Sequence, residues 1–171
     1  MVGRMRRELE RLAAEGDFDG FYRAQYVRLV RALLLLTGDA GEAEDLAQEA
    51  LSRVYERWER VSAMDSSEGY LFRTALNLHR KRARRLRIGA RAEASAGTPN
   101  VDEASIDDRL TVLAAVAKLT RGQREALVLV EWLGFDATEA GEILGIRPVS
   151  VRSRLMDARR NLRRRLGGID G

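Results

Sequence analysis

One stretch near the end of the chain, residues 135–160, limits the possible folds most, because its local signals predict two helices joined by a tight turn. Asp136 stands at an N-cap position and Glu139 follows three residues later, which is the pattern of a capping box. Gly145 suits the left-handed residue at which a helix ends, and Pro148 suits the first position of the next helix. That second helix carries apolar residues on one face and arginines on the other. The layout predicts a DNA-binding helix-turn-helix.

The composition of the whole chain also favours helices. Only 6% of the 171 residues are aromatic, only 2 are proline, and no run alternates Val, Ile or Thr with polar residues. The chain has no cysteine, which excludes disulfides, thiol catalysis and the common structural zinc sites. No apolar run approaches the roughly 20 residues that a membrane span needs, and no apolar signal core follows the basic N-terminus. We therefore expect an all-α protein of the cytoplasm that makes no membrane contact.

Charge is segregated along the chain, although the net charge is only +4. Residues 70–92 and 147–165 each hold eight basic residues, with Asp157 as the one acidic residue in the two segments. Residues 39–49 and 93–108 each hold five acidic residues and no basic one. An arginine-rich helical face can simply be solvated, but two basic segments, one inside a helix-turn-helix, favour two contacts with a polyanion. The acidic segments suggest a partner of another kind, although acids in the first turn of a helix also complement its dipole.

A break in the apolar pattern divides the chain into two small helical domains. Residues 89–100 contain no large apolar side chain, which predicts a flexible linker. We expect an N-terminal extension at residues 1–16, a first domain at 17–87, the linker at 88–104 and a second domain at 105–167. In the second domain, helices at residues 105–119 and 123–133 should precede the helix-turn-helix.

Apolar spacing predicts three helices in the first domain, at residues 18–36, 40–58 and 67–86, with a polar loop at residues 61–67. The side chains expected to face inward are Tyr22, Tyr26, Leu29, Val30, Leu33 and Leu36 in the first helix, Leu46, Ala47, Ala50, Leu51, Val54 and Trp58 in the second, and Leu71, Ala75, Leu78 and Leu86 in the third.

The third helix opens with Tyr70 and Phe72 and continues with outward basic residues. Aromatic faces stack on unpaired bases and arginines neutralise phosphates, so this helix suits a melted DNA strand. For Phe72 alone, a place in the core is the simpler interpretation.

Four segments, in this order and at this spacing, resemble the bacterial RNA polymerase sigma factors of the extracytoplasmic-function (ECF) class within the sigma-70 family. They are Ala43–Ala50, Gly69–Asn77, Leu119–Val128 and Gly145–Arg154. The likeness covers residues 17–165, nearly the whole chain. Each segment alone is a weak signal, because helix-turn-helix patterns are common, but the ordered set is specific. The composition favours the actinobacterial sigma-E-like group.

The resemblance implies a specificity subunit that binds core RNA polymerase and directs promoter-specific transcription initiation. The first domain would be sigma region two and the second sigma region four. The implied partners are core polymerase, through its β′ clamp helices and β flap, and promoter DNA, and the class allows an anti-sigma factor as a further partner. No cofactor, no metal and no catalytic residue is implied.

The resemblance also assigns residues to three contacts. The residues expected to dock on the polymerase are Asp45, Leu46, Gln48 and Glu49. Those expected at the minus-ten element are Tyr70, Arg73, Asn77, Arg80, Lys81 and Arg84. Those expected at the minus-thirty-five element are Arg147, Ser150, Arg152, Ser153, Arg154, Met156 and Arg159. Two departures stand out: Tyr70 replaces the usual Trp, and the turn at residues 147–149 replaces a small, glycine-containing one.

Two other classes of protein are weighed against this interpretation. A stand-alone helix-turn-helix regulator would need a ligand pocket or a phosphorylation site, whereas the N-terminal half offers an acidic helix and a basic helix. A nucleic-acid-processing enzyme would need a carboxylate cluster for metal or a nucleophile with a base. The single histidine, His79, has no cysteine or carboxylate at ligand spacing and no neighbouring nucleophile.

Overall fold

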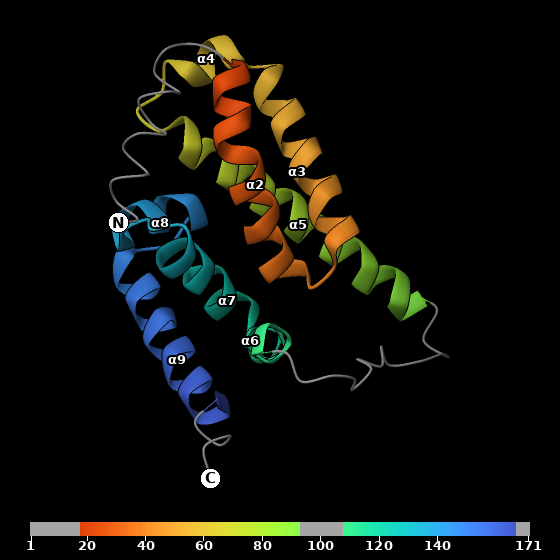
Figure 1. Ribbon diagram of the computed structural model, residues 1–171, viewed down its shortest axis with the longest axis vertical. Coiled ribbons are helices and arrows are strands. Elements are labelled where there is room, and N and C mark those ends of the chain that lie inside the picture. The colour runs from red at the N-terminus through yellow and green to blue at the C-terminus, as the bar shows by residue number, and fades with distance from the viewer. Residues whose placement is uncertain (1–17, 93–107, 167–171) are drawn as a thin grey trace.

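The computed structural model describes residues 18–92 and 108–166, and every regular element in these two ranges is a helix (Figure 1). The elements are α2 (Phe18–Thr37), α3 (Ala40–Tyr55), α4 (Trp58–Ser62), α5 (Ser67–Ala92), α6 (Asp108–Ala117), α7 (Arg121–Leu127), the π-helix η1 (Val128–Trp132), α8 (Ala137–Leu144) and α9 (Pro148–Leu166). The predicted all-α class is confirmed. None of these helices is long and apolar enough to cross a membrane. The predicted N-terminal extension and most of the predicted linker lie outside the described residues.

The turn between α2 and α3 is set by local chemistry. Gly38 adopts a φ of 74°, in the left-handed region that favours glycine, directly after α2 ends. Asp39 then caps α3, because its carboxylate accepts a hydrogen bond from the backbone N–H of Glu42 at 2.7 Å. The two helices consequently run side by side (Figure 1). The expected inner face of α3 is confirmed from Leu46 to Val54.

The inner face of α2 is confirmed at Leu29, Leu33 and Leu36, but its N-terminal part is rotated relative to the prediction. Phe21, Gln25 and Leu29, at intervals of four, are buried. Tyr22 was expected inside but lies at the surface, where its ring stacks on Tyr26 with centroids 5.3 Å apart. The prediction for Tyr22 is therefore wrong, because Phe21 takes the core position one residue earlier.

Three boundaries in the N-terminal half also differ from the prediction. The predicted helix at residues 40–58 ends at Tyr55, and α4 follows, which places Val61 in the core. The Ser67 hydroxyl donates to the carbonyl oxygen of Val61 at 2.8 Å, so the loop before α5 shrinks to residues 63–66. α5 continues to Ala92 and Leu86 is 63% exposed, because this end of the helix projects beyond α3 (Figure 1).

Capping fixes the short helices of the C-terminal half. Asp136 and Glu139 form the predicted capping box, and a second box joins Thr120 to Gln123 at the start of α7. Gly145 ends α8 in the left-handed region, with a φ of 69°. α9 begins at Pro148 as predicted, so the helix-turn-helix is confirmed.

One glycine and one π-helix set the packing of the C-terminal half. A Cβ at Gly141 would lie 2.7 Å from the carbonyl oxygen of Ile146, so glycine is needed for α8 to approach the turn. The π-helix η1, which the sequence pattern does not predict, returns the Leu133 N–H to the Val128 carbonyl oxygen at 3.0 Å. η1 leaves Leu133 in the core and Trp132 at the surface.

The two halves pack against each other through one continuous apolar core. The residues that meet there are Leu29, Ala32, Leu33 and Leu36 of α2, Phe72, Ala75 and Leu76 of α5, and Val128, Leu129 and Leu133 of the C-terminal half. The rings of Phe72 and Phe135 meet edge to face, with centroids 5.7 Å apart. Arg28 adds a polar bridge, because it donates to the carboxylate of Glu68 at 2.6 Å and to the carbonyl oxygen of Leu133 at 3.1 Å.

Candidate nucleic-acid interface

The acidic side chains of α3 lie on the face opposite its core residues. Asp45, Gln48 and Glu49 are exposed, and Glu49 forms an ion pair with Arg53 one turn later at 2.7 Å. Leu46 is only 1% exposed. Leu46 was expected to dock on the polymerase, but in this arrangement its side chain packs in the core. The other three side chains form an open acceptor surface.

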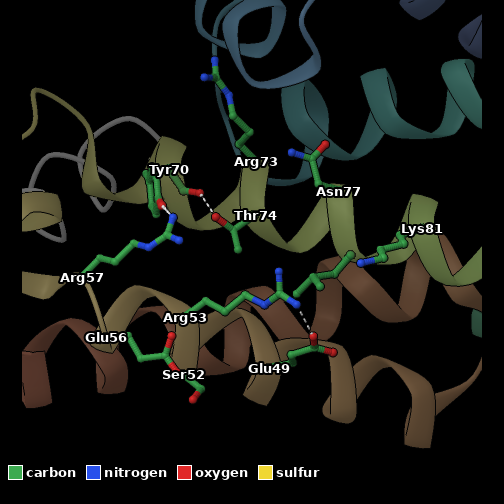
Figure 2. A pocket seen from close by; sticks show the side chains of 11 residues that line it. Glu49, Ser52, Arg53, Glu56, Arg57, Tyr70, Arg73, Thr74, Asn77 and Lys81 are labelled. Atoms are coloured by element: carbon green, nitrogen blue, oxygen red, sulfur yellow. Dashed lines mark hydrogen bonds and ion pairs between the residues drawn. The ribbon is translucent and has the colours of Figure 1, made fainter.

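A groove of about 710 Å³ runs between α3 and α5 (Figure 2). Its lining residues are Glu49, Ser52, Arg53, Glu56, Arg57, Tyr70, Arg73, Thr74, Asn77, Leu78 and Lys81. The groove therefore brings together four of the six residues expected at the minus-ten element, and it leaves Arg80 and Arg84 out. Its rim is mostly cationic, with two carboxylates on the α3 side. Such a combination of cations with an aromatic ring suits a single nucleic-acid strand.

Arg53 and Arg57 complete the cationic rim from the α3 side, and neither was predicted from the sequence. In Figure 2 their side chains reach from α3 and its end toward α5. The guanidinium of Arg57 donates to the hydroxyl oxygen of Tyr70 at 3.1 Å. This bond lowers the pKa of Tyr70 below its usual value and fixes the ring at the groove. The repeat of Glu49, Arg53 and Arg57 at intervals of four was the available signal.

Arg80 points away from the groove and into the contact between the two halves. Its guanidinium makes a two-pronged ion pair with Glu125 of α7, with distances of 2.9 and 2.7 Å. Glu125 is only 2% exposed. The hydrogen bonds that Arg80 donates to Glu125 raise the pKa of Arg80 above its usual value. In this arrangement Arg80 is not available to a phosphate.

α8 lies across the start of α5 and the loop before it. A second cavity of about 250 Å³ is lined by Met64, Asp65, Ser66, Gly69, Tyr70 and Arg73 on one side and by Phe135, Glu139, Glu142 and Ile143 on the other. Arg73 donates to the backbone carbonyl oxygen of Glu142. Arg73 is thus the second residue expected at the minus-ten element, after Arg80, that is hydrogen-bonded to the C-terminal half.

α9 presents a basic face away from its core side. Arg147, Arg152, Ser153, Met156 and Arg159 are exposed, whereas Ser150 and Arg154 are partly buried.

Two of these arginines have contacts within the C-terminal half. Arg159 forms an ion pair with Glu131 of η1. The guanidinium of Arg154 lies over Gly122, where an added Cβ would be 3.1 Å from its nearest nitrogen. These contacts orient α9 and leave the remaining exposed side chains free to reach a DNA groove.

The chain is all-helical in its described residues and carries an acidic face on α3, a cationic groove and a basic helix-turn-helix. This combination is typical of transcription factors that bind DNA. The family models for "Sigma-70 region 2" and "Sigma-70, region 4" match residues 21–88 and 109–162. The ECF RNA polymerase sigma factor SigL of Mycobacterium tuberculosis is 33% identical over 142 residues, which cover 79% of this chain and 80% of that protein. The RNA polymerase sigma-E factor of Streptomyces avermitilis is 29% identical over 163 residues, covering 90% and 87%.

Two solved structures share the fold. The sigma factor RpoE of Bartonella quintana, in complex with the anti-sigma factor NepR, superposes with a TM-score of 0.79 at 22% identity and covers 88% of this chain and 97% of its own. CnrH in complex with the cytosolic domain of CnrY gives a TM-score of 0.67 at 24% identity, with coverage of 95% and 97%.

The chain belongs to the ECF sigma factors of the sigma-70 family, and it resembles actinobacterial members as expected. It binds core RNA polymerase and promoter DNA and directs promoter-specific transcription initiation. The stand-alone regulator is not favoured, because both sigma regions are present in one chain.

Proposed function

We propose that the α3–α5 groove holds the unpaired strand of the minus-ten element, that the exposed acids of α3 dock on the β′ clamp helices, and that α9 binds the minus-thirty-five element. The observation that carries the proposal is the groove, where cationic side chains from two helices surround one aromatic ring and one exposed amide. The acidic face of α3 borders the groove at Glu49. Docking on the polymerase would therefore set the groove beside the DNA that the polymerase must open.

Each side chain of the groove has a separate task in this proposal. The ring of Tyr70, held by Arg57, offers a face on which an unpaired base can stack. The exposed amide of Asn77 can donate to and accept from the edge of an extruded base. Arg53 and Lys81 neutralise phosphates. Since the contacts of Tyr70 and Asn77 form only with an unpaired base, their binding energy offsets the cost of separating the duplex.

The domain limits belong to the same proposal. Residues 17–87 form region two, residues 88–104 the linker and residues 105–167 region four. The two family matches, at 21–88 and 109–162, support this division. Within region four, the exposed Arg147, Arg152, Ser153 and Met156 contact the minus-thirty-five DNA, and the remaining expected residues orient α9. The β flap provides the second contact with the polymerase.

We further propose that the arrangement described above is a closed form that cannot bind the minus-ten strand. Arg80 is paired with Glu125, Arg73 is bonded to α8, and α8 covers the loop before α5. Arg124 of α7 also donates to the carbonyl oxygen of Leu36 at the end of α2, at 2.8 Å. A phosphate and Glu125 compete for the same guanidinium. Binding to core polymerase therefore has to separate the two halves.

The proposal also covers catalysis, cellular location, metal use and a regulatory partner. The chain is a non-catalytic subunit, acts in the cytoplasm where the polymerase works, and uses no metal; within the described residues no three metal-ligating side chains cluster. An anti-sigma factor binds it, as the anti-sigma factor NepR binds RpoE in one of the two solved structures. Titration with a purified candidate anti-sigma factor should release core polymerase from the complex.

The experiment that tests the proposal is run-off transcription with core polymerase on a genomic promoter library, followed by permanganate footprinting. Permanganate oxidises unpaired thymines, so the holoenzyme should reveal a melted segment near the start site of each active promoter. Core polymerase alone should not do so. A chain that binds these DNA fragments without forming a stoichiometric complex with core polymerase would be a stand-alone regulator, and the proposal would be refuted.

A further inference from the structure

Two large apolar side chains are exposed on α9 among its polar and basic residues. Val149 is 53% exposed and Met156 is 59% exposed. They stand seven residues apart, which is two helical turns, so both lie on the same face of α9. The exposed Arg152 and Ser153 lie between them on this face.

This exposure is not a by-product of packing. α9 has a separate inner face, where Val151, Leu155 and Ala158 are buried. Single exposed apolar residues are ordinary at protein surfaces, but here two of them share a face with arginines. The charge of that face favours a polyanion as its partner, and the Arg147 side chain beside it is exposed as well. The partner must therefore offer apolar groups inside a negatively charged surface.

The major groove of duplex DNA has this property. Phosphates line it, and the thymine C5-methyl group is the apolar feature of its base edges. A helix of this basic character enters the major groove with its N-terminal residues toward the bases, and Val149 is the second residue of α9.

We propose that Val149 and Met156 are specificity-determining residues that each contact a thymine methyl group in the minus-thirty-five element. The inference rests on the proposed placement of α9 at that element, and Val149 was not among the residues expected there. The two side chains are about 10 Å apart along the helix axis, which corresponds to about three base steps of DNA. Two thymines at about this separation, on either strand, should therefore carry the apolar part of the recognition.

The test uses the holoenzyme and the strongest promoter from the transcription library. Each thymine of its minus-thirty-five element is replaced, one at a time, by deoxyuridine, which lacks only the methyl group. Two replacements should each weaken binding about fourfold, the amount expected for one buried methyl group. Val149→Ala should abolish the effect at one of these positions and Met156→Ala at the other. Both side chains are exposed, so an unchanged melting temperature checks that the variants fold.

Each alternative outcome is distinguishable. If no deoxyuridine weakens binding, or if the two variants lower binding to thymine and deoxyuridine duplexes equally, the inference is overturned. It is also overturned if either variant weakens binding to core polymerase while DNA binding stays normal, since the face would then serve a protein partner. If the proposed placement of α9 is wrong, scrambling the whole minus-thirty-five element will leave promoter binding by the unaltered holoenzyme unchanged. This result distinguishes failure of the proposed function from failure of the inference.

Discussion

Asn77 is the residue whose role can be separated most cleanly from stability. Its amide is exposed at the groove, so replacing it removes no core contact. Asn77→Ala should slow open-complex formation about tenfold, the typical loss for one amide–base contact, and should leave binding to core polymerase unchanged. Stopped-flow fluorescence of a base analogue in the minus-ten element measures the opening. Arg85→Ala, an exposed change on the same helix outside the groove, is the matched control. Equal opening rates for Asn77→Ala and the unaltered chain would contradict the assignment.

His79 makes the stability of the chain depend on pH. Burial lowers the pKa of its imidazole, opposed by the nearby carboxylates of Glu42 and Glu125 and assisted by Arg124 and Arg121. The folded chain therefore binds this proton less readily than the unfolded chain. Stability is fully present above the unfolded pKa of about 6.5 and is lost as the pH falls below it, by at most about 1.4 kcal/mol per pH unit.

Urea unfolding between pH 7.5 and 5.5 measures this dependence. The unaltered chain should lose stability across the interval, and His79→Gln should give a flatter profile. The Nδ1 atom of His79 is buried and has no hydrogen-bond partner among the described residues, which is consistent with a neutral ring. A pH dependence that is identical in the two proteins would place the titrating group elsewhere.

At the scale of the element, α3 is the helix whose charge can be reversed without disturbing its packing. Asp45 and Glu49 are exposed, while Leu46 and Ala50 hold the other face in the core. Asp45→Lys together with Glu49→Lys should abolish binding to core polymerase, because lysines would face the basic surface expected of the clamp helices. Pull-down with purified core measures the effect, and each single reversal should weaken binding at least about tenfold.

Glu59→Lys provides the control for this charge reversal. It makes the same change at an exposed position of α4, away from the acidic face of α3. It should leave binding within about twofold of the unaltered chain, as expected for a surface charge outside an interface. Equal losses for Glu59→Lys and Glu49→Lys would mean that net charge, and not the face of α3, governs docking.

Elements whose ends depend on neighbouring residues were predictable from the sequence. The helix-turn-helix is the clearest case, since Asp136, Gly145 and Pro148 act through contacts within a few residues. The break after Tyr55 and the π-helix at Val128 have no such local signal, because no glycine or proline marks them. The exposure of Leu86 depends on where α3 begins, which apolar spacing along α5 cannot reveal.

The residues of the candidate site also fall into two groups, those whose position the sequence predicts and those whose contacts it does not. Exposed groove residues on one helix, such as Asn77 and Lys81, follow from helical periodicity. The pairing of Arg80 with Glu125 spans 45 residues, and the spacing along either helix does not predict it. Neighbouring basic side chains on α5 therefore have different roles. These roles depend on how the two halves pack, which the sequence pattern does not show.

At the scale of the whole molecule, the closed arrangement can be locked and released in one sample. The chain has no cysteine of its own. A Cβ at position 69 would lie 3.9 Å from the Ile143 side chain across the contact between the halves. Gly69→Cys with Ile143→Cys should therefore form a disulfide on mild oxidation.

The oxidised double variant should lose run-off transcription by at least about tenfold, and dithiothreitol should restore it. The reason is geometric: the bond keeps α8 over the loop before α5, where Arg73 is already held by Glu142. The added Cβ at position 69 meets the Ser66 hydroxyl oxygen at 2.9 Å, so this hydroxyl has to rotate and gives up its hydrogen bond from the Gly69 N–H. The reduced sample carries the same strain and so controls for it, and each single-cysteine variant should be insensitive to oxidant. Full transcription by molecules shown to carry the disulfide would mean that closure does not block the minus-ten strand.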